Sequence, residues 1–379
     1  MKQVILVCEG MSGDPVEELS ARTPLEVAKT PHMDSLAKKG QLGQASFCPN
    51  SLRASSDVAS MAILGFDPQE FYTGIAPLEA LAMGIPQDDR AIAFRCNLVT
   101  ALDEDLIDAY SGNILSKESR ILIEALNKKL SNDHIKFYPG EGFRNILLVN
   151  DAELSEGLDD LECEPPDSVL GQKVSKNLPK GQGASAILDL MNASKVVLDA
   201  QEINKVRIDL NENPANMIWL WGQGKKPKLP TFQERYGREG CVFSDVDYLK
   251  GLAELLKLKQ ARSLESSIEE NDFVFIYFHW TEGRKIDLKL KIKFIEDFDA
   301  TVVGPAIKKL NMEGNYRFVV TGDYPRPLTK KASMHGFVPF VICGSGIAAD
   351  ESAQFNEKGA LQSKLVFEQG HKLMEYFLK

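Results

Sequence analysis

A serine and an aspartate, Ser56-Asp57, stand directly before residues 58–64, whose apolar spacing predicts a helix. A serine at a helix start lies among unpaired backbone N–H groups and at the positive end of the helix dipole, which favour a phosphate or an ionised alkoxide. The alternative is that Ser56 only caps the helix, because serine is a common N-cap residue. The local spacing favours capping, so this segment alone does not establish a nucleophile.

Arginine is the residue type that would hold an anionic ligand. The guanidinium groups of Arg95, Arg144 and Arg207 suit phosphate and carboxylate groups, although a surface or salt-bridging role is the simpler interpretation of any one of them. The chain has 44 Lys and Arg against 54 Asp and Glu, a net charge of −10. This acidic balance argues against nucleic acid or an anionic membrane as a partner, so an anionic ligand needs a local basic cluster.

Histidine and cysteine limit the metal chemistry. Only five of the 379 residues are histidines, which leaves little material for a His-rich metal centre. The six cysteines have no C-x-x-C or zinc spacing and several lie in apolar runs, which favours buried free thiols in a reducing compartment. The first apolar run ends at Glu9, too early for a signal peptide, and no apolar stretch reaches membrane-spanning length. We therefore expect a cytoplasmic protein.

The elements that position these residues alternate between strands and helices. Apolar runs predict strands at 4–7, 91–99, 146–149, 217–221, 273–278, 317–320 and 338–342, and helical spacing appears at 23–39 (broken at Pro31), 119–130, 244–258 and 288–310. This alternation predicts an α/β fold with a mostly parallel sheet. Residues 85–214 are richer in acidic and polar loops and predict an inserted α+β domain, so the core would comprise 1–84 and 215–379.

Several blocks in order along nearly the whole chain resemble one family. They are residues 23–37, 55–60, 64–68, 72–80, 94–100 (Phe-Arg-Cys-Asn-Leu-Val-Thr), 137–140 and 214–224 (with Trp-Leu-Trp-Gly-Gln-Gly at 219–224). The chain is identified on these blocks as similar to the archaeal-type cofactor-independent phosphoglycerate mutases of the alkaline phosphatase superfamily.

This resemblance implies a fold, a reaction and a set of residues. The fold is an alkaline-phosphatase-like core with an inserted cap domain. The reaction interconverts 3-phosphoglycerate and 2-phosphoglycerate through a phosphoserine, assisted by two divalent ions (Mg²⁺, Mn²⁺ or Zn²⁺). The implied nucleophile is Ser56, and a small phosphorylated acid such as phosphoglycerate is the implied ligand. The implied substrate-binding residues are Asp57, Arg95, Arg144 and Arg207, and the implied metal ligands are Glu9, Ser56, Asp323 and His335.

The chain departs from the family pattern mainly at the metal ligands. Glu9 stands for an aspartate, Tyr324 stands for the histidine of an Asp-His pair, and Ser333 takes the slot of a later histidine, with His335 two residues along. The ligand-bearing segment after the strand at 273–278 is shortened, and Arg284 or Lys285 brings positive charge there. Three further family residues, one arginine and two cap-domain histidines, are replaced by Ile75, Asn113 and Asn145.

These losses leave three hypotheses open. The residues that remain suit one weak Mg²⁺ or Mn²⁺ ion rather than two, which favours a family member with lost or strongly reduced mutase activity. The chain could instead be an active mutase with a rearranged or single-metal site, or act on another small phosphate compound. It could also be a non-catalytic module that binds a phosphorylated ligand or a protein. The sequence does not indicate an oligomeric state.

Overall fold

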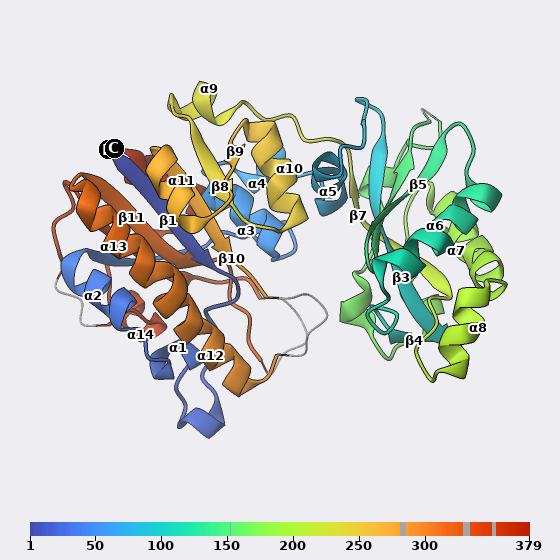
Figure 1. Cartoon of the computed structure of the whole chain (residues 1–379), viewed down its shortest axis with the longest axis horizontal. Coiled ribbons are helices and arrows are strands. Elements are labelled where there is room, and N and C mark those ends of the chain that lie inside the picture. Colours follow the sequence, from blue (N-terminus) through green and yellow to red (C-terminus); the bar gives the residue numbers. More distant parts are fainter. Residues whose placement is uncertain (152, 281–285, 329–333, 351–353) are drawn as a thin grey trace. The chain divides into compact units, whose positions relative to one another are not determined.

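The computed structural model describes residues 1–151, 153–280, 286–328, 334–350 and 354–379 (Figure 1). The chain forms two compact units, Met1–Tyr72 with Leu229–Lys379, and Thr73–Lys228. The second unit extends beyond the expected insertion at 85–214, because helix α5 (Ile75–Ala82) and strand β7 (Met217–Gly224) belong to it. Strand β7 pairs with β3 (Ile92–Leu102), which explains why it joins the second unit.

The first unit is built on an eight-stranded sheet in the order β13-β2-β12-β11-β1-β10-β8-β9. Four neighbouring strands in this order, β11, β1, β10 and β8, are parallel, whereas β12 runs antiparallel to both β11 and β2. The expected α/β fold with a mostly parallel sheet is therefore confirmed. The strand bounds are β1 (Lys2–Cys8), β2 (Gln41–Ala45), β8 (Gly240–Phe243), β9 (Lys259–Gln260), β10 (Phe273–Phe278), β11 (Tyr316–Gly322), β12 (Val338–Gly344) and β13 (Val366–Phe367).

The register of three parallel strands determines where their ends lie. Strand β1 lies between β10 and β11, and Cys8 is aligned with both Phe278 and Gly322. The residues that follow these strands, Glu9 and Asp323 among them, therefore share one edge of the sheet. In open α/β sheets the carboxyl ends of the strands are the usual place for a ligand site.

Helices cover both faces of this sheet. Val4 and Leu6 of β1 share one apolar core with helices α2, α11, α12 and α13 (Figure 1). On the other face Tyr277 of β10 contacts Tyr248 of α10, with ring centroids 6.4 Å apart, and α10 packs on α3. The helices of this unit are α1 (Pro24–Val27), α2 (Pro31–Lys39), α3 (Ser56–Ile63), α4 (Pro68–Phe71), α9 (Phe232–Tyr236), α10 (Asp247–Leu256), α11 (Leu264–Glu270), α12 (Leu288–Phe298), α13 (Gly304–Glu313), α14 (Glu357–Leu361) and α15 (Leu373–Leu378), with short helical turns η1 (Glu17–Leu19) and η6 (Gly370–Lys372).

The helix expected over 288–310 is present but not uniform. A π-helical segment, η5 (Asp299–Val303), separates α12 from α13. Pro305 lies in the first turn of α13. Proline has no N–H to donate and its ring crowds the carbonyl four residues earlier, so a wider turn just before it relieves the strain.

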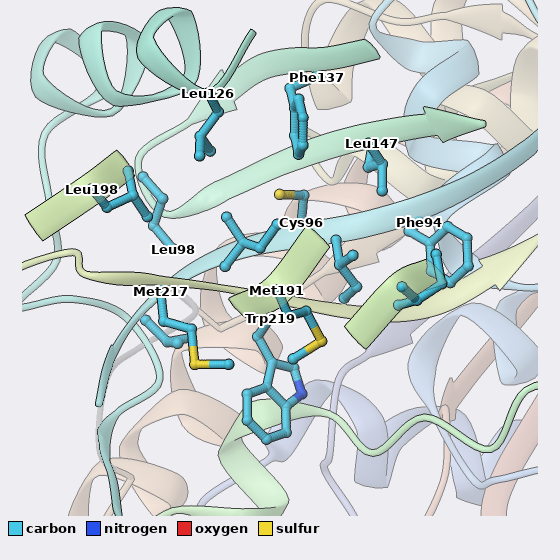
Figure 2. Close-up of a cluster of buried hydrophobic side chains, with 14 of the residues drawn as sticks. Phe94, Cys96, Leu98, Leu126, Phe137, Leu147, Met191, Leu198, Met217 and Trp219 are labelled. Atoms are coloured by element: carbon cyan, nitrogen blue, oxygen red, sulfur yellow. The ribbon is translucent and has the colours of Figure 1, made fainter. Parts of the chain in front are cut away.

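The second unit has an antiparallel sheet in the order β4-β3-β6-β5, with β7 also paired to β3. Figure 2 shows its core, in which Phe94, Cys96 and Leu98 of β3 lie near Met191 of α7 and Trp219 of β7. Burial of such large apolar side chains is the main favourable contribution to the folding of a unit of this kind. Its remaining elements are β4 (Asp105–Asp108), β5 (Ile135–Glu141), β6 (Arg144–Val149), α6 (Ser116–Leu130), α7 (Ala184–Asp199), α8 (Glu202–Asp209), η2 (Leu158–Asp160), η3 (Pro166–Val169) and η4 (Val174–Lys176).

All six cysteines are free, as expected, and burial raises the pKa of the Cys48 thiol to about 12. Within the described ranges, no helix has both the length and the apolar character needed to cross a membrane.

Candidate active site

Ser56, Glu9 and Asp323 come together at the carboxyl edge of the large sheet. Glu9 follows β1 and Asp323 follows β11, while Ser56 is the first residue of α3. The Ser56 hydroxyl lies 2.8 Å from Asp323 Oδ2 and 3.2 Å from Glu9 Oε1. The N-cap of α3 is Ser55, so Ser56 does not cap the helix and its hydroxyl donates to a carboxylate instead.

Asp323 is fully buried and accepts several hydrogen bonds. Its Oδ1 accepts from the backbone N–H groups of Gly10 (2.7 Å) and Tyr324 (2.8 Å), and its Oδ2 accepts from the Tyr277 hydroxyl (2.9 Å) as well as from Ser56. Burial raises the pKa of Asp323 above its ordinary value, and the charge of Arg326 offsets only part of this effect. A carboxylate with a raised pKa, 2.8 Å from a serine hydroxyl, is suited to accept the serine proton.

Arg326 supplies the positive charge at this site. Its Nη2 atom lies 2.8 Å from Glu9 Oε1, 3.3 Å from Ser56 Oγ and 2.5 Å from the Tyr324 hydroxyl oxygen. The sequence motifs do not point to Arg326; they predict the charge at Arg284 or Lys285, which lie outside the described residues, as does Ser333. The sequence feature that could have pointed to Arg326 is its position, three residues after Asp323 in the same loop.

Lys291 of α12 anchors this loop. Its Nζ donates to the backbone carbonyls of Arg326 (2.7 Å) and Ser12 (3.0 Å), and the Arg326 N–H also donates to Ser12 O (3.0 Å). The loop after β11 is thus bound directly to the loop after β1. Burial lowers the pKa of Lys291 to about 8.

The two histidines near the sequence-predicted ligands do not complete a metal centre. His335 is exposed and its Nδ1 lies 3.3 Å from Cys48 O. Across the described ranges no three His, Cys, Asp or Glu side chains are grouped to hold a metal ion, so the structure does not place His335 with Glu9 and Asp323. His279 has partners on both ring nitrogens, Asp245 at 2.5 Å and Trp280 O at 2.7 Å.

The three arginines expected to bind substrate all belong to the second unit, and each has an acidic neighbour. Arg95 forms a buried, two-pronged ion pair with Glu79 and lies over the Trp221 ring. Arg207 is also buried; it donates to Glu118 (2.8 Å), Ser111 O (2.8 Å) and Asn213 O (3.0 Å), while Arg144 is half-buried with Nη2 3.5 Å from Glu141. Asp57, in the first unit, accepts a short hydrogen bond from Tyr72.

These residues do not fit the two-ion centre that the family resemblance implies. The oxygen atoms of Glu9, Asp323 and Ser56 are the kind of ligand that Mg²⁺ or Mn²⁺ prefers. However, a guanidinium nitrogen contacts two of these residues, and the described structure adds no histidine to them. The arrangement is a serine hydroxyl between two carboxylates and one organic cation.

The chain is similar to known proteins over its whole length. Residues 37–204 match the family model described as 2,3-bisphosphoglycerate-independent phosphoglycerate mutase. Two relatives, a probable 2,3-bisphosphoglycerate-independent phosphoglycerate mutase of Geobacter sulfurreducens and the enzyme so named of Methanothrix thermoacetophila, are each 36% identical, with 100% of both chains covered.

Solved structures share the fold. A protein of Pyrococcus horikoshii superposes with a TM-score of 0.79 at 24% identity, covering 100% of this chain and 96% of that one. The cofactor-independent phosphoglycerate mutase of Thermoplasma acidophilum gives a TM-score of 0.59 at 24% identity, with 99% and 98% of the two chains covered.

Proposed function

Because the chain belongs to the 2,3-bisphosphoglycerate-independent phosphoglycerate mutase family, we propose that it binds a small phosphorylated acid of the phosphoglycerate type and has lost most or all of its mutase turnover. The observation that carries this proposal is the contact of Arg326 Nη2 with both Ser56 and Glu9. The substrate class of the family supports the choice of a phosphorylated acid as the ligand. Such a ligand agrees with the cytoplasmic location expected from the free cysteines.

The chain's own residues can perform only part of the reaction. Asp323 is placed to take the proton of Ser56, and the guanidinium of Arg326 can offset one negative charge of a phosphate. Phosphoryl transfer depends on neutralising charge on several oxygens at once. The guanidinium of Arg326, already paired with Glu9, neutralises much less of this charge than two divalent ions would. We therefore expect a loss of several orders of magnitude in rate.

Turnover is tested by coupling 3-phosphoglycerate conversion to enolase, with Mn²⁺, Mg²⁺ or Co²⁺ added. We expect a rate far below the range of about 1–10³ s⁻¹ typical of enzymes, unchanged in Ser56→Ala. A rate within that range that Ser56→Ala abolishes would refute the loss of activity. It would favour the alternative of an active mutase with a single ion on the oxygens of Glu9, Ser56 and Asp323, which do lie together.

Ligand binding is tested separately by thermal shift with 3-phosphoglycerate. We expect a rise in Tm that Arg144→Ala reduces, since the family resemblance assigns Arg144 to the substrate and its side chain is half-buried. Arg120→Ala, an exposed arginine on α6, is the matched control and should leave the shift intact. Absence of a shift with 3-phosphoglycerate and other phosphorylated acids would contradict the proposed ligand and favour a protein-binding module.

A further inference from the structure

One nitrogen atom of Arg326 contacts three side-chain oxygen atoms. Nη2 contacts Glu9 Oε1, Ser56 Oγ and the Tyr324 hydroxyl at 2.8, 3.3 and 2.5 Å. Glu9 and Ser56 are two of the residues that the family resemblance assigns to a metal, and Tyr324 occupies the slot of a family histidine. Asp323, a third residue that the resemblance assigns to a metal, accepts a hydrogen bond from the same Ser56 hydroxyl.

The distances from Nη2 to these three oxygen atoms suit an N–H donor rather than a metal ion. The Glu9 contact of 2.8 Å lies within the roughly 2.7–3.2 Å usual for N–H···O hydrogen bonds, the Tyr324 contact is shorter and the Ser56 contact longer. All three are longer than the about 2.0–2.1 Å at which Mg²⁺ holds oxygen ligands. A divalent ion placed among the same oxygens would also lie within contact distance of a positive guanidinium, and like charges at this range repel each other. Guanidinium and ion are therefore competitors for the same oxygens.

The surrounding structure holds the guanidinium in this position. The Arg326 backbone is fixed by hydrogen bonds to Ser12 and Lys291, and Lys291 is 2% exposed. Gly10 adopts a left-handed φ of +57°, and a Cβ atom there would lie 3.1 Å from Arg326 Cδ. A side chain at Gly10 would therefore press on the arginine, so the turn after β1 leaves the space that the arginine needs.

We propose that Arg326 is the resident cation of this site and takes the place of a divalent metal ion. It neutralises part of the charge of Glu9 and Asp323 and excludes Mn²⁺ or Mg²⁺ from their oxygens. Without Arg326 the site has two carboxylates, whose negative charge its guanidinium no longer balances, and two hydroxyl oxygens. These oxygens are a donor set for a hard divalent ion. This inference rests on the same site as the proposed function, but it is measured as metal binding and not as turnover.

The test compares Mn²⁺ binding by the full-length wild-type protein and three variants, using calorimetry and thermal shift. We expect no stoichiometric metal in purified wild type and no change of its Tm with Mn²⁺. Arg326→Ala should bind about one Mn²⁺ and gain on the order of 5 °C in Tm at saturating Mn²⁺. Arg326→Lys keeps the charge and should not respond. Arg317→Ala removes a half-buried arginine that donates to the carbonyls of Ser345 and Phe377, away from this site, and should also not respond.

The wild-type measurement decides the proposal even if Arg326→Ala fails to fold. One or more equivalents of metal bound tightly by wild type would overturn it, as would a folded Arg326→Ala variant that gains no Mn²⁺ binding. The two proposals fail separately. Wild type that binds metal but does not turn over 3-phosphoglycerate refutes only the resident cation, whereas metal-free wild type that turns over at an ordinary rate refutes only the lost activity.

Discussion

Lys291 is the residue whose burial has the clearest consequence for pH dependence. Its pKa falls from 10.5 to about 8 because burial disfavours the charged amine. Between these values the unfolded chain holds a proton that the folded chain has released, so this group makes the free energy of unfolding rise with pH. The neutral amine still has two N–H groups for the carbonyls of Ser12 and Arg326.

We therefore expect the difference in unfolding free energy between wild type and Lys291→Met to grow in favour of wild type as pH rises from 8 to 10.5. The full effect is about 3 kcal/mol, and urea unfolding across this range measures it. Lys293→Met, which removes an exposed lysine on the same helix, is the control and should show a constant difference. A constant difference for Lys291→Met as well would mean that its pKa is not lowered by folding.

At the residue scale the sequence identifies the groups but not their partners. The family resemblance implies Glu9, Ser56, Asp323 and His335 at one site, and the structure brings the first three together but not His335. Arg326 was not predicted, because its contact with Glu9 depends on the path of the loop after β11 and only its closeness to Asp323 in the sequence hints at it. The partners of Arg95 and Arg207, Glu79 and Glu118, are 16 and 89 residues away in the chain, and no local pattern links them.

At the scale of elements, the ion pair of Arg95 and Glu79 connects β3 to α5. Both side chains are buried. Arg95→Met leaves the Glu79 carboxylate without its arginine in an apolar setting, and we expect a loss of about 3–5 kcal/mol in stability. The double variant Arg95→Met/Glu79→Leu should recover much of this, because no buried charge then lacks its partner. Denaturant unfolding measures both, and equal losses in single and double variants would contradict this explanation.

The start of helix α2 depends on another element. Its N-cap residue Thr30 makes no side-chain capping bond, and Asp299 of η5 instead accepts from the N–H groups of His32 (3.1 Å) and Met33 (2.8 Å). We expect Asp299→Ala to cost about 1–3 kcal/mol, since the buried N–H of Met33 and the part-buried N–H of His32 lose their acceptor. Asp297→Ala, an exposed neighbour paired with Lys293, should change stability by less than about 0.5 kcal/mol in thermal unfolding. Similar losses for both would exclude a capping role.

The element predictions succeeded where apolar side chains dominate a segment. Strands β1, β10 and β11 are almost wholly buried, and their composition made them recognisable. The π-helical turn at Asp299–Val303 was not visible, because its residues keep helical spacing and only hydrogen bonding distinguishes it. Strand β9 is two exposed residues long, and it exists only because β8 offers an edge to pair with.

For the whole molecule, the boundaries of the second unit make a direct prediction. Its ends meet, because Thr73 Oγ1 donates to Lys225 O at 2.6 Å, and it has its own apolar core (Figure 2). We expect a fragment of residues 73–228 to fold alone and to unfold cooperatively by circular dichroism. The shorter fragment 85–214 lacks α5 and β7, so β3 loses one of its paired strands and the fragment should not fold. A cooperative transition in the shorter fragment would support the narrower boundaries, 85–214, that the sequence predicts.

The tie between Arg326 and Glu9 also bears on how the protein would behave in a changing cell. A cation carried on the same chain as its carboxylate partner has an effective local concentration that does not depend on the medium. A low concentration of free metal ions cannot remove the Arg326 guanidinium from the site. At a high concentration, metal ions must displace this intramolecular group before they bind. On this basis the positive charge at the site is present as soon as the chain folds. It does not depend on the concentration of free divalent ions, which the family reaction requires.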